Sequence, residues 1–189
     1  MGTRKARTRR LKENFFNLYC NGKGIDIGCA DRPLTNNIDK WDLSINPRQD
    51  ATYMHGIPDE HYDFVYSSHC LEDLIVPNIA LQNWWRIIKP GGYIILYLPH
   101  RDLYEMKRTL PSNGNPDHKY YFLIDRDEPL CTIGLIPFIT RTLTRYDIIY
   151  VKKCDYDYHV YIENSITVPD GEFSIETVIR KLKPGEYNY

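Results

Sequence analysis

The hydrophobic positions of this chain fall into two patterns, short continuous runs and longer stripes with helical spacing. Runs rich in β-branched and aromatic residues occur at 24–27, 62–66 and 93–98, and the last is apolar at nearly every position. Strands that are buried on both faces of a parallel sheet have this composition. Apolar residues three and four positions apart predict helices over 11–19 and 77–88. This alternation indicates a mostly parallel sheet covered by helices.

Weaker signals complete the predicted order of elements. Strands are predicted at 38–42 and 51–55, and a helix at 132–143 precedes two late strands at 146–153 and 173–180. The crossover after the first strand is short, because a parallel connection usually needs about a dozen residues or more. A Pro-Asp-Gly turn before the last strand predicts that this strand runs antiparallel. The whole pattern predicts a three-layer α/β sandwich with a seven-stranded sheet and pared-down early helices.

The turn that follows the first predicted strand is where we expect a ligand. Ligands of open α/β sheets bind beyond the carboxyl ends of the strands, and Gly28 allows a close approach because it has no Cβ. A dinucleotide requires three glycines in such a turn, whereas the next glycine is Gly56 and Asp31 would repel a phosphate. S-adenosylmethionine has no phosphate. Its ribose hydroxyls suit a carboxylate such as Asp42, at the end of the second predicted strand.

Four motifs in about the first hundred positions carry a resemblance to one family. The first is an apolar strand with an acid and a glycine turn, Ile25–Ala30, and the second is an acid that ends the second strand, Trp41–Ser44. The third is an aromatic-Asp strand followed by His-x-Leu-Glu, Tyr62–Glu72, and the fourth is a helix-to-strand junction, Trp85–Gly92. In this order and spacing, the chain resembles a class I S-adenosylmethionine-dependent methyltransferase of the small, methyltransferase type 11-like kind. The resemblance implies a Rossmann-like fold, S-adenosylmethionine as cofactor and S-adenosylhomocysteine as product.

The resemblance also implies which residues form the site. The cofactor would be held near the carboxyl ends of the early strands by Asp26, Ile27, Gly28, Cys29, Ala30, Asp42, Leu43, His55, Gly56, Ile57, Ser67, Ser68 and His69. A histidine can act as a general base near neutral pH, and the candidates are His69, His100 and His118. Each histidine also has a plain structural interpretation as a hydrogen-bonded side chain. No metal site is predicted, because the cysteines form no Cys-x-x-Cys pair.

These features predict a single methyltransferase domain over residues 1–189, which transfers a methyl group in line to a small-molecule or glycan-type acceptor. Enzymes that methylate nucleic-acid amines carry an Asn/Asp-Pro-Pro-aromatic motif after the fourth strand, where this chain has Ser-Ser-His at 67–69. Three departures from the family favour an alternative, a non-catalytic module that binds the cofactor or a protein partner. Ala30 replaces the second glycine, Asp73 replaces a histidine, and no acid is identifiable after the third strand.

Composition and charge narrow the location and the partners. A net charge of −1 gives no field that would draw the chain to nucleic acid, and no apolar run is long enough to span a bilayer. Five scattered cysteines predict reduced thiols in a cytoplasm. Residues 1–12 are predicted as a basic arm, which either contacts phosphates or anionic lipid or is a solvated, disordered tail. The aperiodic segment 101–131 is long enough to be a substrate-side loop or lid.

Overall fold

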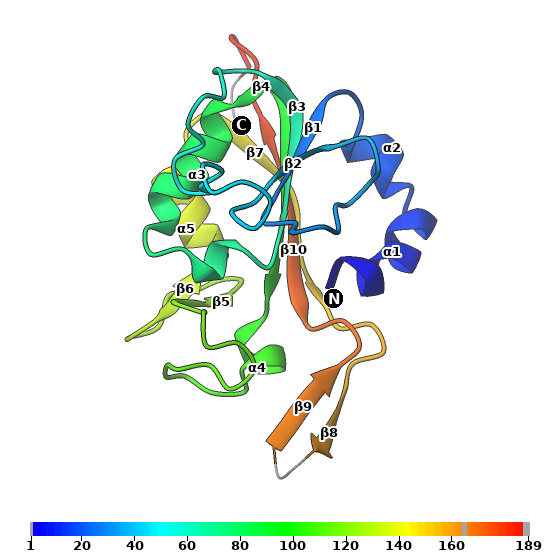
Figure 1. The fold of residues 1–189 in the computed structure, drawn as a ribbon, viewed down its shortest axis with the longest axis vertical. Coiled ribbons are helices and arrows are strands. Elements are labelled where there is room, and N and C mark those ends of the chain that lie inside the picture. Colours follow the sequence, from blue (N-terminus) through cyan, green and yellow to red (C-terminus); the bar gives the residue numbers. More distant parts are fainter. Residues whose placement is uncertain (1, 164–165, 187–189) are drawn as a thin grey trace.

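The main sheet runs through the middle of the molecule, and helices lie on both of its faces (Figure 1). A computed structural model describes residues 2–163 and 166–186 of the chain. Within these ranges the main sheet has six strands in the order β2-β1-β3-β4-β10-β7. Their bounds are β1 Gly24–Ile27, β2 Asp39–Trp41, β3 Tyr62–Ser68, β4 Ile88–Pro99, β7 Tyr146–Cys154 and β10 Ser174–Lys181.

The strand directions confirm a mostly parallel sheet with an antiparallel last strand. β1 pairs in parallel with β2 and β3, and β3 pairs in parallel with β4. β10 lies between β4 and β7 and runs antiparallel to both. The carboxyl ends of β1, β3 and β4 therefore meet at one end of the sheet, and the residues that follow these strands come together there.

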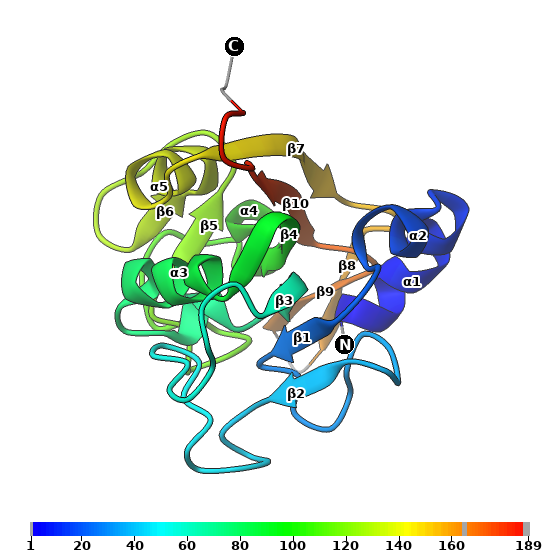
Figure 2. The same cartoon turned by 90° about the horizontal axis from the view of Figure 1, so that it is seen from above.

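Two pairs of helices cover the two faces of the sheet. The pair α3 and α5 lies on one face, and the pair α1 and α2 lies on the other, as two perpendicular views show (Figures 1 and 2). The bounds of these helices are α1 Gly2–Lys12, α2 Phe15–Tyr19, α3 Pro77–Arg86 and α5 Leu135–Thr142. The molecule is therefore the three-layer sandwich that the hydrophobic pattern predicts.

Side chains of β3 alternate between two cores, as the two-residue period of a strand requires. Val65 packs in the core that includes Trp84 of α3. Phe64 and Tyr66 point to the opposite face and pack with Phe15 of α2. Burial on both faces explains why this strand reads as a nearly continuous apolar run in the sequence.

The prediction of a third strand at 51–55 is wrong, because these residues form turns. The main sheet therefore has six described strands and not the predicted seven. Carbonyls of the turn residues accept hydrogen bonds from side chains of α3: Trp84 Nε1 donates to Ala51 O at 2.7 Å, and Asn83 Nδ2 donates to Thr52 O at 3.0 Å. Met54 has a φ of 50°, which interrupts an extended chain. β2 is consequently the last described strand on its side of the sheet.

The basic segment predicted as an arm forms helix α1, and the helix predicted over 11–19 is divided in two. Asn14 has a φ of 55°, a left-handed conformation that separates α1 from α2. Arg9 and Arg10 turn towards the sheet, and Arg10 is wholly buried. Met1, the first residue of the predicted arm, lies outside the described residues.

The segment 101–131 is more regular than its sequence indicates. It contains α4 (Arg101–Tyr104) and β5 (Tyr121–Leu123), which pairs in parallel with β6 (Thr132–Gly134). β6 occupies the start of the helix predicted at 132–143, so α5 begins three residues later than expected. These short elements hold the segment against the body of the molecule beside α5 (Figure 1).

Two further boundaries differ from the sequence prediction. The helix predicted over 77–88 ends at Arg86, and β4 begins at Ile88, so the Lys-Pro-Gly-Gly stretch of the predicted helix-to-strand junction already belongs to the strand. A hairpin formed by β8 (His159–Glu163) and β9 (Ile166–Asp170) extends below the sheet and has no predicted counterpart (Figure 1). Among the described helices, none has both the length and the apolar character needed to cross a membrane.

Candidate functional site

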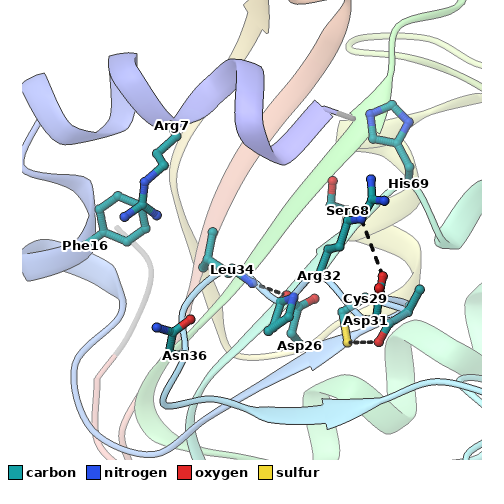
Figure 3. A pocket seen from close by; sticks show the side chains of 13 residues that line it. Arg7, Phe16, Asp26, Cys29, Asp31, Arg32, Leu34, Asn36, Ser68 and His69 are labelled. Atoms are coloured by element: carbon teal, nitrogen blue, oxygen red, sulfur yellow. Dashed lines mark hydrogen bonds and ion pairs between the residues drawn. The ribbon is translucent and has the colours of Figure 1, made fainter. Parts of the chain in front are cut away.

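A cavity of about 770 Å³ opens at the carboxyl ends of β1 and β3 (Figure 3). The turn after β1 and the end of β3 form one side of it, while α1 and α2 contribute Arg7 and Phe16. Its volume is typical of a small-molecule or cofactor site. The residues of the predicted cofactor site that line it are Asp26, Gly28, Cys29, Ala30, Ser68 and His69.

The turn after β1 has a backbone conformation that favours glycine at its first position. Gly28 has a φ of 78°, and a Cβ on it would lie 2.5 Å from the Cβ of Cys70. Ala30, where the family has a second glycine, also has a positive φ of 48°. The amide of Ala30 donates to Asp42 Oδ2 at 2.8 Å, which holds the turn in place from the neighbouring strand.

Asp26 has one carboxylate oxygen with a partner and one without. Oδ2 accepts a hydrogen bond from the amide of Leu34 at 2.7 Å. Oδ1 is buried and has no hydrogen-bond partner among the described residues. Burial raises the pKa of Asp26 to about 7, against the opposing effects of the Leu34 amide and of Arg10. A cationic donor in the cavity would satisfy this oxygen and stabilise the ionised carboxylate.

Asp42 braces the turn but is largely occupied by its own chain. Oδ1 accepts from both the amide and the hydroxyl of Ser44, at 2.8 and 2.6 Å. Burial alone would raise the pKa of Asp42, but the hydrogen bonds from Ser44 and Ala30 outweigh it and lower the pKa. A carboxylate has about four lone-pair sites, and these three donors leave roughly one of them for a ligand.

Several predicted cofactor residues lie away from the cavity. Leu43 is 57% exposed, and His55 stacks on Tyr53 in the turn region that replaces the predicted third strand. Ser67 donates its hydroxyl to the carbonyl of Ile27, so both residues serve the contact between β1 and β3. Gly56 and Ile57, which follow His55, are also absent from the cavity lining.

Of the three candidate histidines, only His69 lines the cavity. The side chain of His69 is 24% exposed, and its Nε2 lies 3.3 Å from Ser174 Oγ. Burial lowers the pKa of this imidazole to about 3. His100 caps α4, because its Nδ1 accepts from the amide of Asp102 at 3.2 Å. His118 is buried, and its Nδ1 lies 2.5 Å from Glu105 Oε1.

Sequence reasoning missed two groups of residues at this site. Arg7 and Phe16 line the cavity from α1 and α2, although their segment gave only a basic and an apolar signal. Glu72 and Glu105 lie beside His69 and His118, behind the cavity. Glu72 belongs to the His-x-Leu-Glu motif, so the sequence offered a signal for it, because an acid three residues after His69 would need a polar partner if it is buried. No sequence pattern marks Glu105.

Residues 11–96 of the chain match a family model described as a methyltransferase domain. No curated protein matches the chain significantly. The matched part of the chain is therefore similar to a methyltransferase domain, and the four sequence motifs that resemble class I S-adenosylmethionine-dependent methyltransferases lie within it. The family match covers α2, β1, β2, β3, α3 and most of β4, and it includes every residue that lines the cavity except Arg7.

Solved structures share the fold of this chain at low sequence identity. A S-adenosylmethionine-dependent methyltransferase from Archaeoglobus fulgidus is 15% identical, with a TM-score of 0.55 over 94% of this chain and 92% of that one. Another from Aquifex aeolicus is 12% identical, with a TM-score of 0.53 over 93% and 89%. The (4+2)-cyclase SpnF is also 12% identical, with a TM-score of 0.50 over 92% and 81%.

The residues at the cavity fit S-adenosylmethionine, the cofactor of this family. The unpartnered Oδ1 of Asp26 suits its ammonium group. The turn from Gly28 to Ala30 brings backbone to the cavity surface. Asp42 does not itself line the cavity but holds the turn that does. Its remaining lone-pair site would suit one ribose hydroxyl beside that turn, and a second would require Ser44 to release Oδ1.

Proposed function

We propose that the chain transfers a methyl group from S-adenosylmethionine to a small-molecule or glycan-type acceptor. The observation that carries this proposal is the position of Asp26 and His69 on one cavity, with an unpartnered acid oxygen at the first and a neutral imidazole at the second. The bound cofactor supplies an activated methyl group. The protein must then mainly hold the acceptor in line and exclude water.

Residues at the carboxyl ends of β1 and β3 share the work of holding the cofactor and the acceptor. Asp26 binds a cationic group, and the backbone of the Gly28 turn, braced by Asp42, limits how that group lies. His69 is neutral at pH 7, because burial lowers its pKa to about 3. A neutral imidazole has one ring nitrogen with a free electron pair and can accept a proton from an acceptor in the cavity, although the lowered pKa makes His69 a weaker base than an ordinary histidine.

Further inferences about the domain, the partners and the location follow from this proposal. The chain acts as one domain, and the segment 101–131 forms its acceptor side, because this segment brings Glu105 and His118 next to the motif that contains Glu72. Arg9 and Arg10 contact acids of the chain itself, which disfavours α1 as a nucleic-acid arm. All five cysteines have free thiols, which supports a cytoplasmic location.

Isothermal calorimetry with S-adenosylhomocysteine on the full chain tests the cofactor site. We expect binding, and Asp26→Asn should weaken it at least about tenfold by removing the charge that pairs with the ammonium. Glu60→Gln, an exposed substitution away from the cavity, is the matched control and should leave the affinity unchanged. Failure of the unaltered chain to bind at millimolar ligand would overturn the proposal.

A second candidate function is a cofactor-binding module without methyl transfer. Two observations favour it: Asp42 is largely occupied by Ser44 and Ala30, and the same fold is found in a cyclase, so the fold alone does not decide the reaction. Binding of S-adenosylhomocysteine together with no transfer to hydroxyl, amine or carboxyl acceptors would favour the module. Transfer to any of these acceptors would exclude it.

A further inference from the structure

Behind His69 lies a group of buried acids and imidazoles, which we call the acid–imidazole cluster: His69, Glu72, Asp73, Glu105 and His118. Its members come from the end of β3, from the 3₁₀-helix η1 (Leu71–Asp73), from the residue after α4 and from the 101–131 segment. Glu72 is 0% exposed, while Glu105 and His118 are 4% exposed. The two outer members are His69, which faces the cavity, and Asp73, whose side chain is 30% exposed.

One oxygen of Glu72 lies between two imidazoles. Glu72 Oε1 is 3.5 Å from His69 Nδ1 and 3.8 Å from His118 Nε2. His118 Nε2 is in turn 3.9 Å from Asp73 Oδ1. The cluster thus leads from the cavity through alternating imidazole and carboxyl groups to a side chain that reaches solvent.

Other contacts fix the inner members of the cluster. The carbonyl of Glu72 accepts from the amides of Lys119 and Tyr120, at 2.8 and 3.1 Å, so the 101–131 segment is tied to η1 next to His118. Glu105 Oε1, 2.5 Å from His118 Nδ1, orients that ring so that Nε2 faces Glu72 and Asp73. Glu105 is therefore a positioning residue.

Four carboxylate oxygens of the cluster lack hydrogen-bond partners among the described residues: both oxygens of Glu72, Oδ1 of Asp73 and Oε2 of Glu105. Buried acids without partners are costly, and such atoms indicate a missing proton or ligand. No group of three or more His, Cys, Asp or Glu among the described residues is arranged to hold a metal ion. Neighbouring members of the path lie 3.5 to 3.9 Å apart, which is too far for direct hydrogen bonds, so a proton bound to an acid or a small approach of the side chains would satisfy these oxygens without any additional group.

We propose that His69, Glu72, His118 and Asp73 form a proton path that carries the proton of a hydroxyl acceptor from the cavity to solvent. This inference rests on the proposed function and assigns the acceptor class. A hydroxyl is a weak nucleophile unless its proton is removed during the transfer, whereas a neutral amine attacks with its free electron pair. A path for a proton is therefore useful to a hydroxyl acceptor, and three acids disfavour an anionic one.

The proposed step is balanced as follows in atoms and charge. The acceptor oxygen gives its proton to His69 Nε2 and forms a bond to the methyl carbon, while the carbon–sulfur bond breaks and its electron pair stays on sulfur. His69 then passes the proton of Nδ1 to the ionised Glu72, Glu72 gives a proton to His118 Nε2, and His118 Nε2 gives it to Asp73 and solvent. The hydrogen left on His69 Nε2 returns to Nδ1 by exchange with solvent in the open cavity, which restores the starting state. His69 is the catalytic residue of this path, and Glu72 and His118 act through it.

The charges around the cluster decide when the path is open. Burial raises the pKa of Glu72 well above its ordinary value, and the nearby Asp73 and Glu105 raise it further. Besides burial, His118 and Arg10 of α1 keep His69 neutral. While Glu72 holds a proton, it cannot take the proton of His69 Nδ1, and the path is closed. The path opens when pH rises through the pKa of Glu72.

Nuclear magnetic resonance of the full chain with ¹⁵N-labelled histidine tests the path without an acceptor. With S-adenosylhomocysteine added, the ring nitrogens of His69 and His118 should change together at one pH midpoint well above that of an ordinary glutamate. In Glu72→Gln this shared midpoint should disappear, because an amide cannot exchange the proton. Glu60→Gln should retain it. Separate midpoints in the unaltered chain, or a shared one that persists in Glu72→Gln, would overturn the proposal.

Methyl transfer to catechol as a hydroxyl probe and to benzylamine as an amine probe tests the acceptor class. Transfer to catechol should rise with pH at the same midpoint and fall by about 10²-fold in Glu72→Gln and His118→Gln. Transfer to benzylamine in preference to catechol would overturn the hydroxyl assignment.

Calorimetry separates this inference from the proposed function. Glu72→Gln should bind S-adenosylhomocysteine as the unaltered chain does, since Glu72 does not line the cavity. A chain that binds no cofactor loses the proposed function, whereas a chain that binds it with independent histidines loses only the proton path.

Discussion

Arg10 of α1 donates from Nε to Oε2 of Glu176 of β10 at 2.7 Å, and both side chains are fully buried. The guanidinium also lies 4.8 to 5.2 Å from the ring centroids of Phe15, Tyr66 and Tyr97. A charge in this apolar surrounding is tolerated only with its partner in place. The first helix is thereby fastened to the antiparallel strand in the sheet.

Replacing Arg10 should be strongly destabilising. Arg10→Met keeps the apolar stem but takes from Glu176 its closest charged partner, and we expect the free energy of unfolding to fall by about 3 kcal/mol. Urea unfolding measures this loss. Arg141→Met breaks the exposed pair with Asp127 and should cost no more than about 1 kcal/mol. Similar losses in the two variants would contradict the account.

The same pair should make the chain sensitive to acid. Burial alone would raise the pKa of Glu176, but Arg10 and Arg9 reverse this effect and lower it to about 2 from 4.5. Its contribution to stability is complete above pH 4.5 and is lost as pH falls towards 2, because the unfolded state then binds more protons. Arg10→Met should lose less stability across this window, as thermal unfolding at several pH values would reveal.

Asp26 should have the opposite pH dependence. Its pKa is raised from 3.8 to about 7, so the folded state binds more protons and the free energy of unfolding falls as pH rises between these values. Asp26→Asn should therefore raise stability at pH 8 by roughly 2 kcal/mol. If the variant and the unaltered chain show the same pH dependence of unfolding, Asp26 is not the titrating group.

Gly28 and Gly56 offer a matched test of the turn after β1. Both have positive φ, at 78° and 83°, but only a Cβ at Gly28 would meet another residue within 4 Å. Gly56→Ala should cost about 1 kcal/mol for its backbone alone. Gly28→Ala should cost a further 1 to 3 kcal/mol, roughly, because Cys70 must move. Calorimetry should also show that only Gly28→Ala weakens S-adenosylhomocysteine binding.

Asp42 and Ser44 separate the ligand role of the acid from its structural role. Asp42→Asn should weaken S-adenosylhomocysteine binding about tenfold, since the amide pairs less strongly with a ribose hydroxyl and with the Ala30 amide. Ser44→Ala removes only the hydroxyl 2.6 Å from Oδ1 and should bind at least as well as the unaltered chain. Weaker binding in Ser44→Ala than in Asp42→Asn would show that Asp42 does not contact the ligand.

The strands of the sheet that are buried on both faces were predictable from the sequence. β3 and β4 are apolar on both faces, and no other element could bury such runs. The failure at 51–55 has a specific cause, because Trp84 and Asn83 take the carbonyls that a neighbouring strand would have used. No local pattern announces a contact made 31 to 33 residues away.

The candidate site was predictable to the extent that it lies next to the turn after β1. Asp26, Gly28 and His69 follow from strand ends, which converge in any parallel sheet. Glu105 and Arg10 could not be found in this way, since neither follows a strand end and each matters through its partner, His118 at 13 residues and Glu176 at 166 residues along the chain. Their roles depend on tertiary packing, which the spacing of residues does not encode.

Because Arg7 lines the cavity three residues before the buried Arg10, the first helix is a wall of the ligand site. The basic composition of this stretch would suggest a dispensable leader to anyone planning an expression plasmid. Trimming it would remove Arg7 from the cavity and open that side to water. A purification tag placed before it would be attached next to the same wall and could displace the helix. A tag at the other end of the chain avoids both effects.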